Sequence, residues 1–129
     1  AAGAGGVQAP FAQALGQDIF IMSSGTMDFA HSNSLSITSI IETDNGAGGG
    51  LTTTGGVIMS GSGTLALQAA NTYTGSTQCN GGTIQVSVDN NLGASSNPLN
   101  FNGGALEITT TGFSTSRSVT LNSLGGTIN

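Results

Sequence analysis

A glycine pair recurs along the second half of the chain within nearly the same motif. The motif reads NGGTIQV at residues 80–86, NGGALEI at residues 102–108 and GGTIN at residues 125–129, so the pairs lie 22 residues apart. A fixed period in the low twenties is typical of a solenoid, in which each repeat forms one coil. This spacing would place Asn80 above Asn102, where the two side chains could form a hydrogen-bonded ladder.

Short segments of alternating apolar and polar residues accompany these glycines and predict β-strands. Around the first pair, Ile84, Val86 and Val88 would share one face, with Gln85 and Ser87 on the other. No segment has a sustained period of 3.6 residues, so we expect essentially no helix. Asp28 and Glu107 are expected to point outward, each between two inward residues of its strand. The further residues expected to point inward are Met27, Phe29, Leu35, Ile37, Leu65, Leu67, Leu99, Phe101, Leu106, Ile108, Val119, Leu121 and Ile128.

A β-sandwich or barrel also consists of short alternating strands, but it does not require one constant period. In a parallel solenoid equivalent residues stack about 4.8 Å apart, so the same turn must recur at one interval. We therefore expect an all-β solenoid of about six coils of about 22 residues, with Leu65, Ile84, Leu106 and Ile128 in one inward stack. The segments GTMDF and GTLAL look alike, which predicts that the two strands occupy the same inward slots.

The chain divides into an irregular N-terminal edge or linker at residues 1–16 and a repeat segment at residues 17–129. The run DNGAGGG at residues 44–50 predicts a turn or an extended loop. No run of about 18 apolar residues is long enough for a transmembrane helix. The N-terminus lacks the basic and apolar regions of an intact signal peptide, so we expect a processed chain or a fragment.

Charge is scarce in this chain of 129 residues. Six acidic residues, one Arg and no Lys give a net charge of −5, so Arg117 is the only fixed cation. Nucleic-acid binding requires a basic face that displaces counterions, and the composition disfavours it strongly. An anionic membrane surface is disfavoured for the same reason.

The stretch at residues 61–93 resembles the passenger-associated repeat of bacterial autotransporters. The matching motifs are GTLAL at residues 63–67, ANTYTG at residues 70–75 and NGGTIQV at residues 80–86, and GGGLTTTG at residues 48–55 resembles the segment that often precedes this repeat. The resemblance implies a right-handed parallel β-helix, secreted by a Gram-negative bacterium and displayed at its outer membrane or released from it.

Four residues could carry chemistry, and each has a structural interpretation. Cys79, the only cysteine, stands at the same offset from its glycine pair as Phe101, which predicts a buried hydrophobic side chain rather than a nucleophile. The family pattern usually has a small apolar residue there. His31 follows a strand and is expected at the solvated surface. Tyr73 would cover a coil corner, with contact to a sugar or a receptor as the alternative, and Arg117 stands alone in a Ser/Thr run.

The carboxylates are spread along the chain, whereas β-helical polysaccharide lyases cluster them around calcium and use Lys or Arg as the base. We therefore expect no catalytic, cofactor-binding or metal-binding residue. Three or more converging acidic side chains would instead favour a lyase or hydrolase. The carboxylates are Asp18, Asp28, Glu42, Asp44, Asp89 and Glu107.

The leading functional interpretation is an extracellular, non-enzymatic rod or adhesive scaffold. Its partners would be neighbouring coils of a longer chain or other copies, and a host or cell-surface ligand. Solenoid ends expose unpaired strand edges, so end-to-end assembly into a filament is a further interpretation. A polysaccharide lyase or hydrolase on the same helix is the enzymatic alternative.

Overall fold

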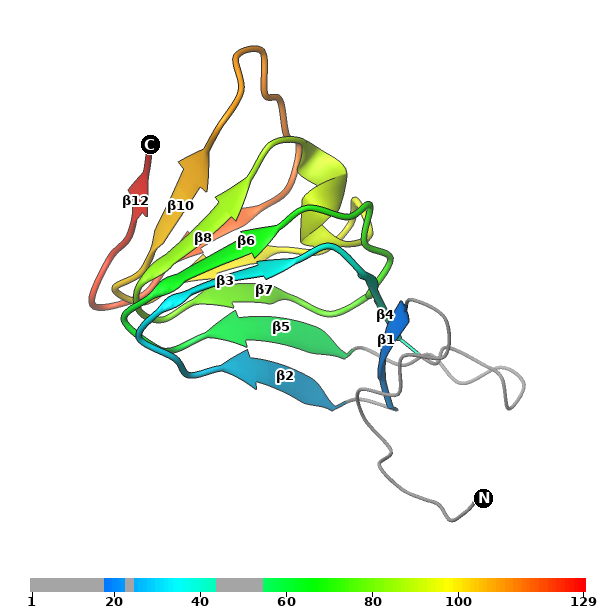
Figure 1. Ribbon diagram of the computed structural model, residues 1–129. Coiled ribbons are helices and arrows are strands. Elements are labelled where there is room, and N and C mark those ends of the chain that lie inside the picture. Colours follow the sequence, from blue (N-terminus) through cyan, green and yellow to red (C-terminus); the bar gives the residue numbers. More distant parts are fainter. Residues whose placement is uncertain (1–17, 23–24, 44–54) are drawn as a thin grey trace.

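The strands of the chain wind into a parallel β-solenoid (Figure 1). The computed structural model describes residues 18–22, 25–43 and 55–129, and within them it has two five-stranded sheets and one two-stranded sheet. The first sheet contains β2 (Thr26–Phe29), β5 (Gly56–Met59), β7 (Thr77–Cys79), β9 (Leu99–Phe101) and β11 (Val119–Leu121). The second contains β3 (Ser34–Ile37), β6 (Thr64–Leu67), β8 (Thr83–Val86), β10 (Ala105–Ile108) and β12 (Thr127–Ile128). The small sheet pairs β1 (Asp18–Ile21) with β4 (Ile40–Thr43).

Matching residues of successive coils stand beside one another in parallel register. Leu65 pairs with Ile84, Ile84 with Leu106, and Leu106 with Ile128. In the first sheet, Cys79 pairs with Phe101 in the same way. The inward stack expected from the repeat is therefore confirmed, and so is the parallel solenoid.

The solenoid makes about four turns of about 22 residues, rather than six. The last glycine pairs keep their spacing, but Met27 pairs with Val57, thirty positions further on. This longer excursion includes β4 and residues 44–54, and the latter lie outside the described ranges. Dividing the chain length by one period therefore gave too many coils. The N-terminal edge at residues 1–16, the loop at residues 44–50 and most of the GGGLTTTG segment also fall outside these ranges.

The predicted equivalence of GTMDF and GTLAL is wrong. Strand β2 lies in the first sheet beside β5, whereas β6 lies in the second sheet beside β3. Leu65 and Leu67 thus do not occupy the slots of Met27 and Phe29. Both segments begin with Gly-Thr, but one comes before the turn between the sheets and the other comes after it.

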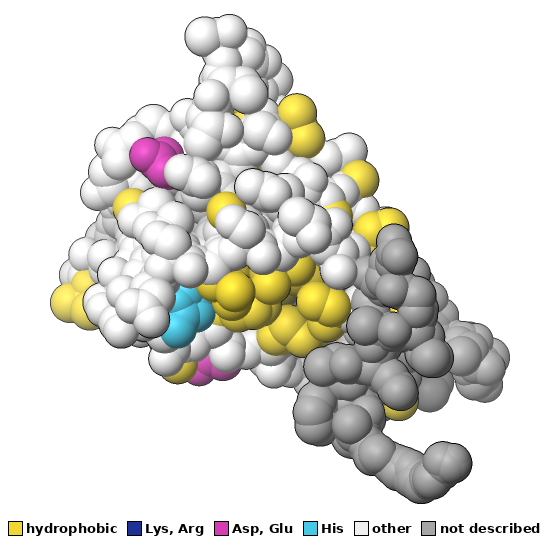
Figure 2. Space-filling view, viewed as in Figure 1, with side chains coloured by type: hydrophobic (Ala, Val, Ile, Leu, Met, Phe, Trp, Pro, Cys, Tyr) yellow, Lys and Arg dark blue, Asp and Glu magenta, His cyan; other side chains and the backbone are white. Residues whose placement is uncertain are grey.

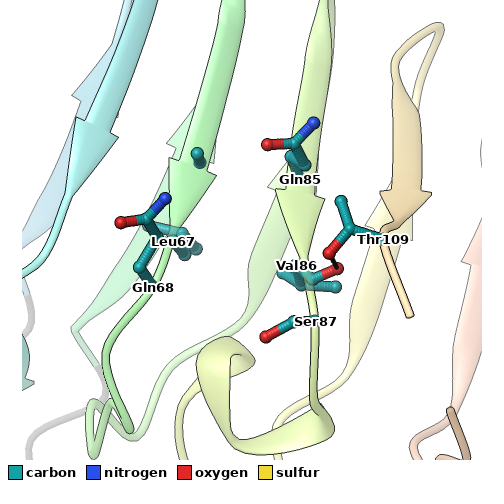
Figure 3. A pocket seen from close by; sticks show the side chains of 7 residues that line it. Leu67, Gln68, Gln85, Val86, Ser87 and Thr109 are labelled. Atoms are coloured by element: carbon teal, nitrogen blue, oxygen red, sulfur yellow. Dashed lines mark hydrogen bonds between the residues drawn. The ribbon is translucent and has the colours of Figure 1, made fainter.

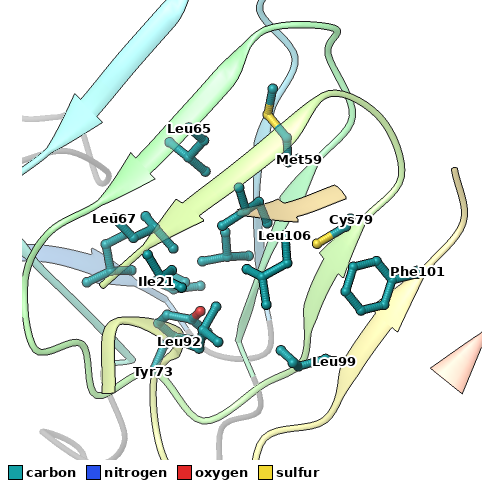
Figure 4. Close-up of a cluster of buried hydrophobic side chains, with 14 residues drawn as sticks. Ile21, Met59, Leu65, Leu67, Tyr73, Cys79, Leu92, Leu99, Phe101 and Leu106 are labelled. Atoms are coloured by element: carbon teal, nitrogen blue, oxygen red, sulfur yellow. The ribbon is translucent and has the colours of Figure 1, made fainter. Parts of the chain in front are cut away.

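The core fills the space between the sheets, where side chains from both converge (Figure 4). Each large apolar side chain buried there contributes about 1.5–3 kcal/mol. Burial fades in the last coil, where Leu121 is 62% exposed and Ile128 is 53% exposed. The largest fully buried side chains include Tyr73, Phe101, Ile41, Met59, Leu65, Leu67, Ile84, Leu92, Leu99 and Leu106.

Tight turns connect the two sheets, and glycine is required where coils approach closely. At Gly82, φ is +51°, and a Cβ would lie 2.3 Å from the carbonyl oxygen of Gly63 in the preceding coil. The expected ladder between Asn80 and Asn102 does not form in this turn. Instead, Asn102 Oδ1 accepts a hydrogen bond of 3.2 Å from the backbone N–H of Leu124.

The segment after β8 turns away from the sheet earlier than expected. Val88 is 49% exposed, so its predicted inward orientation is wrong, because β8 ends at Val86 and the 3-10 helix η1 (Asp89–Leu92) follows. The described residues contain no α-helix, in line with the sequence. None of their helices has the length and apolar character to cross a membrane.

Candidate functional site

A network of polar side chains lies on the side of the coils opposite the tight turns, near η1. We call this side the corner. Arg117 is only 7% exposed there, although it is charged. Its Nε lies 2.8 Å from Asp89 Oδ1 and its Nη2 lies 3.0 Å from Asp89 Oδ2, which makes a bidentate ion pair.

The same guanidinium also donates to backbone carbonyl oxygens of the preceding coil. The distances are 2.8 Å to Gly93, 2.6 Å to Ala94 and 3.0 Å to Asp89. Arg117 thereby ties the chain before β11 to the loop after β8. The sequence suggested an isolated Arg, and the only signal for this role was its status as the one fixed cation of an acidic chain.

The pKa of Asp89 reflects this arrangement. Burial raises the pKa of the carboxyl group, but hydrogen bonds from Arg117 and Thr115 and the guanidinium charge lower it. The net result is a pKa below the ordinary value of 3.8, so the carboxylate is the stable form.

Two asparagines connect further coils at the corner. Asn71 Oδ1 accepts from the backbone N–H of Ile41 at 2.8 Å, and Asn71 Nδ2 donates to the carbonyl oxygen of Asn91 at 2.7 Å. Asn91 Oδ1 in turn accepts from the N–H of Val88 at 3.1 Å, and its Nδ2 donates to the carbonyl oxygen of Ala69 at 2.8 Å. These side chains satisfy backbone groups that the sheets leave unpaired.

Tyr73 lies below the corner with none of its surface exposed. Its hydroxyl and that of Thr77, which points inward from β7, are 2.6 Å apart. Burial raises the pKa of the Tyr73 phenol despite this hydrogen bond. Tyr73 thus covers the interior of the coil, and its ring offers no surface for a sugar or a receptor.

The two candidate nucleophilic or acid–base residues lie apart from this network. Cys79 is buried beside Phe101 as expected, and burial raises the pKa of its thiol to about 12. His31 stands in the turn after β2, where its Nδ1 is 2.7 Å from the Asn33 carbonyl oxygen. His31 is half-buried rather than solvated, because its ring packs edge-on against Phe29 at a centroid distance of 6.4 Å.

The carboxylates within the described ranges do not converge. Asp28 accepts from Ser60 Oγ at 2.6 Å and Glu107 from Gln85 Nε2 at 2.5 Å, while Asp89 pairs with Arg117. No group of three or more His, Cys, Asp or Glu side chains able to hold a metal occurs in this part of the chain. Glu42 is half-buried in β4, Asp18 is the first residue of β1, and Asp44 lies outside the described residues.

Comparisons with known proteins place this fold in context. Residues 57–86 match the family model of the passenger-associated transport repeat. The chain carries an autotransporter passenger repeat. A stretch of 63 residues is 51% identical to the adhesin BmaC autotransporter of Brucella suis biovar 1 (strain 1330). It covers 49% of the chain but 2% of the adhesin, so the chain spans a very small part of that relative. No solved structure matches the chain significantly.

The passenger repeat spans β5 to β8, which are two strands from each large sheet, so it contains elements of two successive coils. Its GTLAL motif ends with β6 and its NGGTIQV motif contains β8, so both motifs supply the second sheet. Its ANTYTG motif forms the corner and contains Asn71 and Tyr73. Both residues are buried and hydrogen-bonded, so the most distinctive motif of the repeat is explained by coil geometry.

Proposed function

We propose that the chain is a structural segment of an autotransporter passenger, displayed at the outer membrane of a Gram-negative bacterium or released from it. Its coils would form a rod that supports adhesion and performs no catalysis. The observation that carries this proposal is the unbroken buried column through Leu65, Ile84 and Leu106. The passenger repeat and the similarity to an adhesin support the cellular setting.

A scaffold role needs length and rigidity but no reacting group. Consecutive coils are joined by parallel strand pairing on two faces and by polar side chains at the corner. Figure 2 shows few charged side chains on one face, where backbone and side chains that are neither hydrophobic nor charged surround a patch of hydrophobic side chains. No observation favours the lyase or hydrolase alternative, because Asp28, Asp89 and Glu107 each bind a separate local group.

Deletion of whole coils tests the scaffold role. Removing residues 83–104 joins equivalent positions, because Thr83 and Ala105 stand in register, and removing residues 105–126 does the same for Ala105 and Thr127. In bacteria that display the parent passenger, either deletion should preserve surface display and reduce binding to an epithelial monolayer by the same small amount. Deletion of residues 83–93 breaks the register and should abolish display.

The two whole-coil deletions separate a scaffold from a single binding site. Loss of adhesion after one deletion but not after the other would contradict a role based on length alone. Surface display, measured by antibody labelling of intact cells, controls for export.

We also propose that copies of this chain associate end to end. Apolar side chains remain exposed in the last coil, including Leu121 at 62% and Leu124 at 71%. Sedimentation velocity of the 129-residue chain should therefore show concentration-dependent assembly, which Leu124→Asp should weaken. A stable monomer at high concentration would contradict this proposal.

A further inference from the structure

Two adjoining cavities follow the corner where β6, β8 and β10 end. The first has a volume of about 230 Å³ and is lined by polar side chains that include Gln68, Gln85 and Thr109 (Figure 3). The second, of about 270 Å³, lies between Asp89 and the loop at residues 110–114. Ser87 lines both cavities, so they lie next to each other, and together we call them the corner groove.

The polar groups of the corner groove repeat along the solenoid axis. Gln68, Ser87 and Thr109 are the first residues after the stacked strands β6, β8 and β10. Stacked strands are about 4.8 Å apart, a distance close to the length of one sugar ring. An extended ligand with a similar repeat would meet an equivalent polar group in each coil.

Some hydroxyls of the groove are already oriented by the backbone. Thr109 Oγ1 donates to the carbonyl oxygen of Val86 at 3.2 Å, and Thr110 Oγ1 donates to that of Ser87 at 2.6 Å. A hydroxyl that has donated its proton retains lone pairs that accept hydrogen bonds. These two side chains are therefore fixed acceptors for the hydroxyl groups of a ligand.

Other side chains of the groove offer donors. Gln68, Thr111 and Ser114 have no intramolecular side-chain hydrogen bond among the described residues, and all three are exposed. An amide supplies both donors and an acceptor, and a hydroxyl supplies one donor. The groove therefore combines fixed acceptors with free donors, which suits a ligand that carries many hydroxyl groups.

The charge of the groove selects against anions. Arg117, the only fixed cation, is committed to Asp89 and to backbone carbonyls, and Asp89 itself lines the second cavity. A sulfate, phosphate or uronate group would therefore meet a carboxylate and no free cation. Val88 is 49% exposed and Phe113 is half-buried, so the same cavity also has apolar surface for the C–H faces of a sugar.

We propose that the corner groove binds an uncharged oligosaccharide that lies along the solenoid axis. Gln68, Thr111 and Ser114 would donate to it, and Thr109 and Thr110 would accept from it. This binding site goes beyond the scaffold role and does not depend on it, since a rod without any ligand would still extend a passenger.

Saturation-transfer NMR on the 129-residue chain tests the proposal with defined probes. The neutral probes are tetrasaccharides of glucose, mannose and N-acetylglucosamine, and the anionic probes are tetragalacturonate and a heparin tetrasaccharide. A Gly/Ser peptide represents a protein ligand. We expect binding of at least one neutral probe, weakened roughly two- to tenfold by either Gln68→Ala or Thr111→Ala, the loss expected for one hydrogen bond.

Matched variants outside the groove provide the control. Gln78→Ala and Thr120→Ala alter the same residue types in β7 and β11 of the first sheet and should leave the affinity unchanged. Circular dichroism melting confirms that all four variants fold. The proposal is overturned if no neutral probe binds, if an anionic probe or the peptide binds more tightly, or if the control variants weaken binding equally.

Discussion

The sheets and the corner of this solenoid hold successive coils together by different means. In the sheets the same contact recurs, as in the pairing of Leu65 with Ile84 and of Ile84 with Leu106. At the corner each pair of coils has its own contacts, such as those of Asn71 with Ile41 and those of Arg117 with the loop after β8. The repetitive side determines the architecture, whereas the irregular side depends on individual polar residues.

The largest expected effect lies in the sheets, where Ile84→Ala should destabilise the chain by about 2–5 kcal/mol. Ile84 has no exposed surface and stands in the middle of the inward stack. Urea unfolding followed by circular dichroism measures the change in the free energy of unfolding. Ile128→Ala is a matched control, because Ile128 belongs to the same stack but is 53% exposed.

The Ile128 variant should lose less than about 1 kcal/mol, within the range of surface substitutions and partial burial. Equal losses for the two isoleucines would mean that burial within the stack does not determine stability. The repetitive contacts would then not explain the strength of the sheets.

At the corner, Asp89→Asn should cost about 2–3 kcal/mol, since it leaves the buried guanidinium of Arg117 without a counter-charge. The Asp89 side chain is 28% exposed, so we expect less than the full cost of breaking a deeply buried pair. Arg117 is the only site for trypsin, because no other Lys or Arg occurs in the chain. The variant should therefore also be cleaved faster after Arg117, since the ion pair no longer holds this residue. Urea unfolding and the rate of native-state cleavage measure the two effects.

Asp28→Asn provides the control, because Asp28 is exposed and accepts a hydrogen bond from Ser60 rather than an ion pair. It should change neither quantity appreciably. Resistance of the Asp89 variant to trypsin at the parent level would show that the ion pair does not hold the corner closed.

The same ion pair predicts a pH dependence in acid. The folded state lowers the pKa of Asp89, so the contribution of the ion pair to stability is complete above the unfolded pKa of about 3.8 and is lost as the pH falls through the lower folded pKa. The difference in unfolding free energy between the parent and Asp89→Asn should therefore be constant from about pH 7 to pH 5 and shrink below about pH 4. A difference that stays constant throughout the acid range would contradict the assignment.

These effects also mark the boundary of what the sequence predicted. The column of Ile84 and Leu106 was predictable, because alternation and a 22-residue period identify both the face and the register. The corner was not, because Arg117 and Asp89 are 28 residues apart and belong to no repeating pattern. The predicted number of coils was wrong for a related reason, since the chain from β2 to its partner β5 is longer than one period.

A smaller effect should come from the interior below the corner, where Tyr73→Phe removes one of two buried hydroxyls. The Thr77 hydroxyl would then have no partner, at a cost of about 1–3 kcal/mol. The double variant Tyr73→Phe/Thr77→Val removes both hydroxyls and should recover much of the loss. A double variant no more stable than Tyr73→Phe would show that the hydrogen bond itself, and not the unpaired hydroxyl, determines the cost.

The smallest effect is expected on the outer face of the second sheet, where the Gln85 amide donates to Glu107 of the next coil. This pair is half-buried, so Gln85→Ala should cost roughly 0.2–1 kcal/mol, the range of a single cross-strand pair. Urea unfolding of Gln85→Ala, Glu107→Ala and the double variant would isolate the coupling between the two side chains. A coupling as large as the effect of Asp89→Asn would remove the distinction between the two regions, since polar contacts would then be equally strong on the sheets and at the corner.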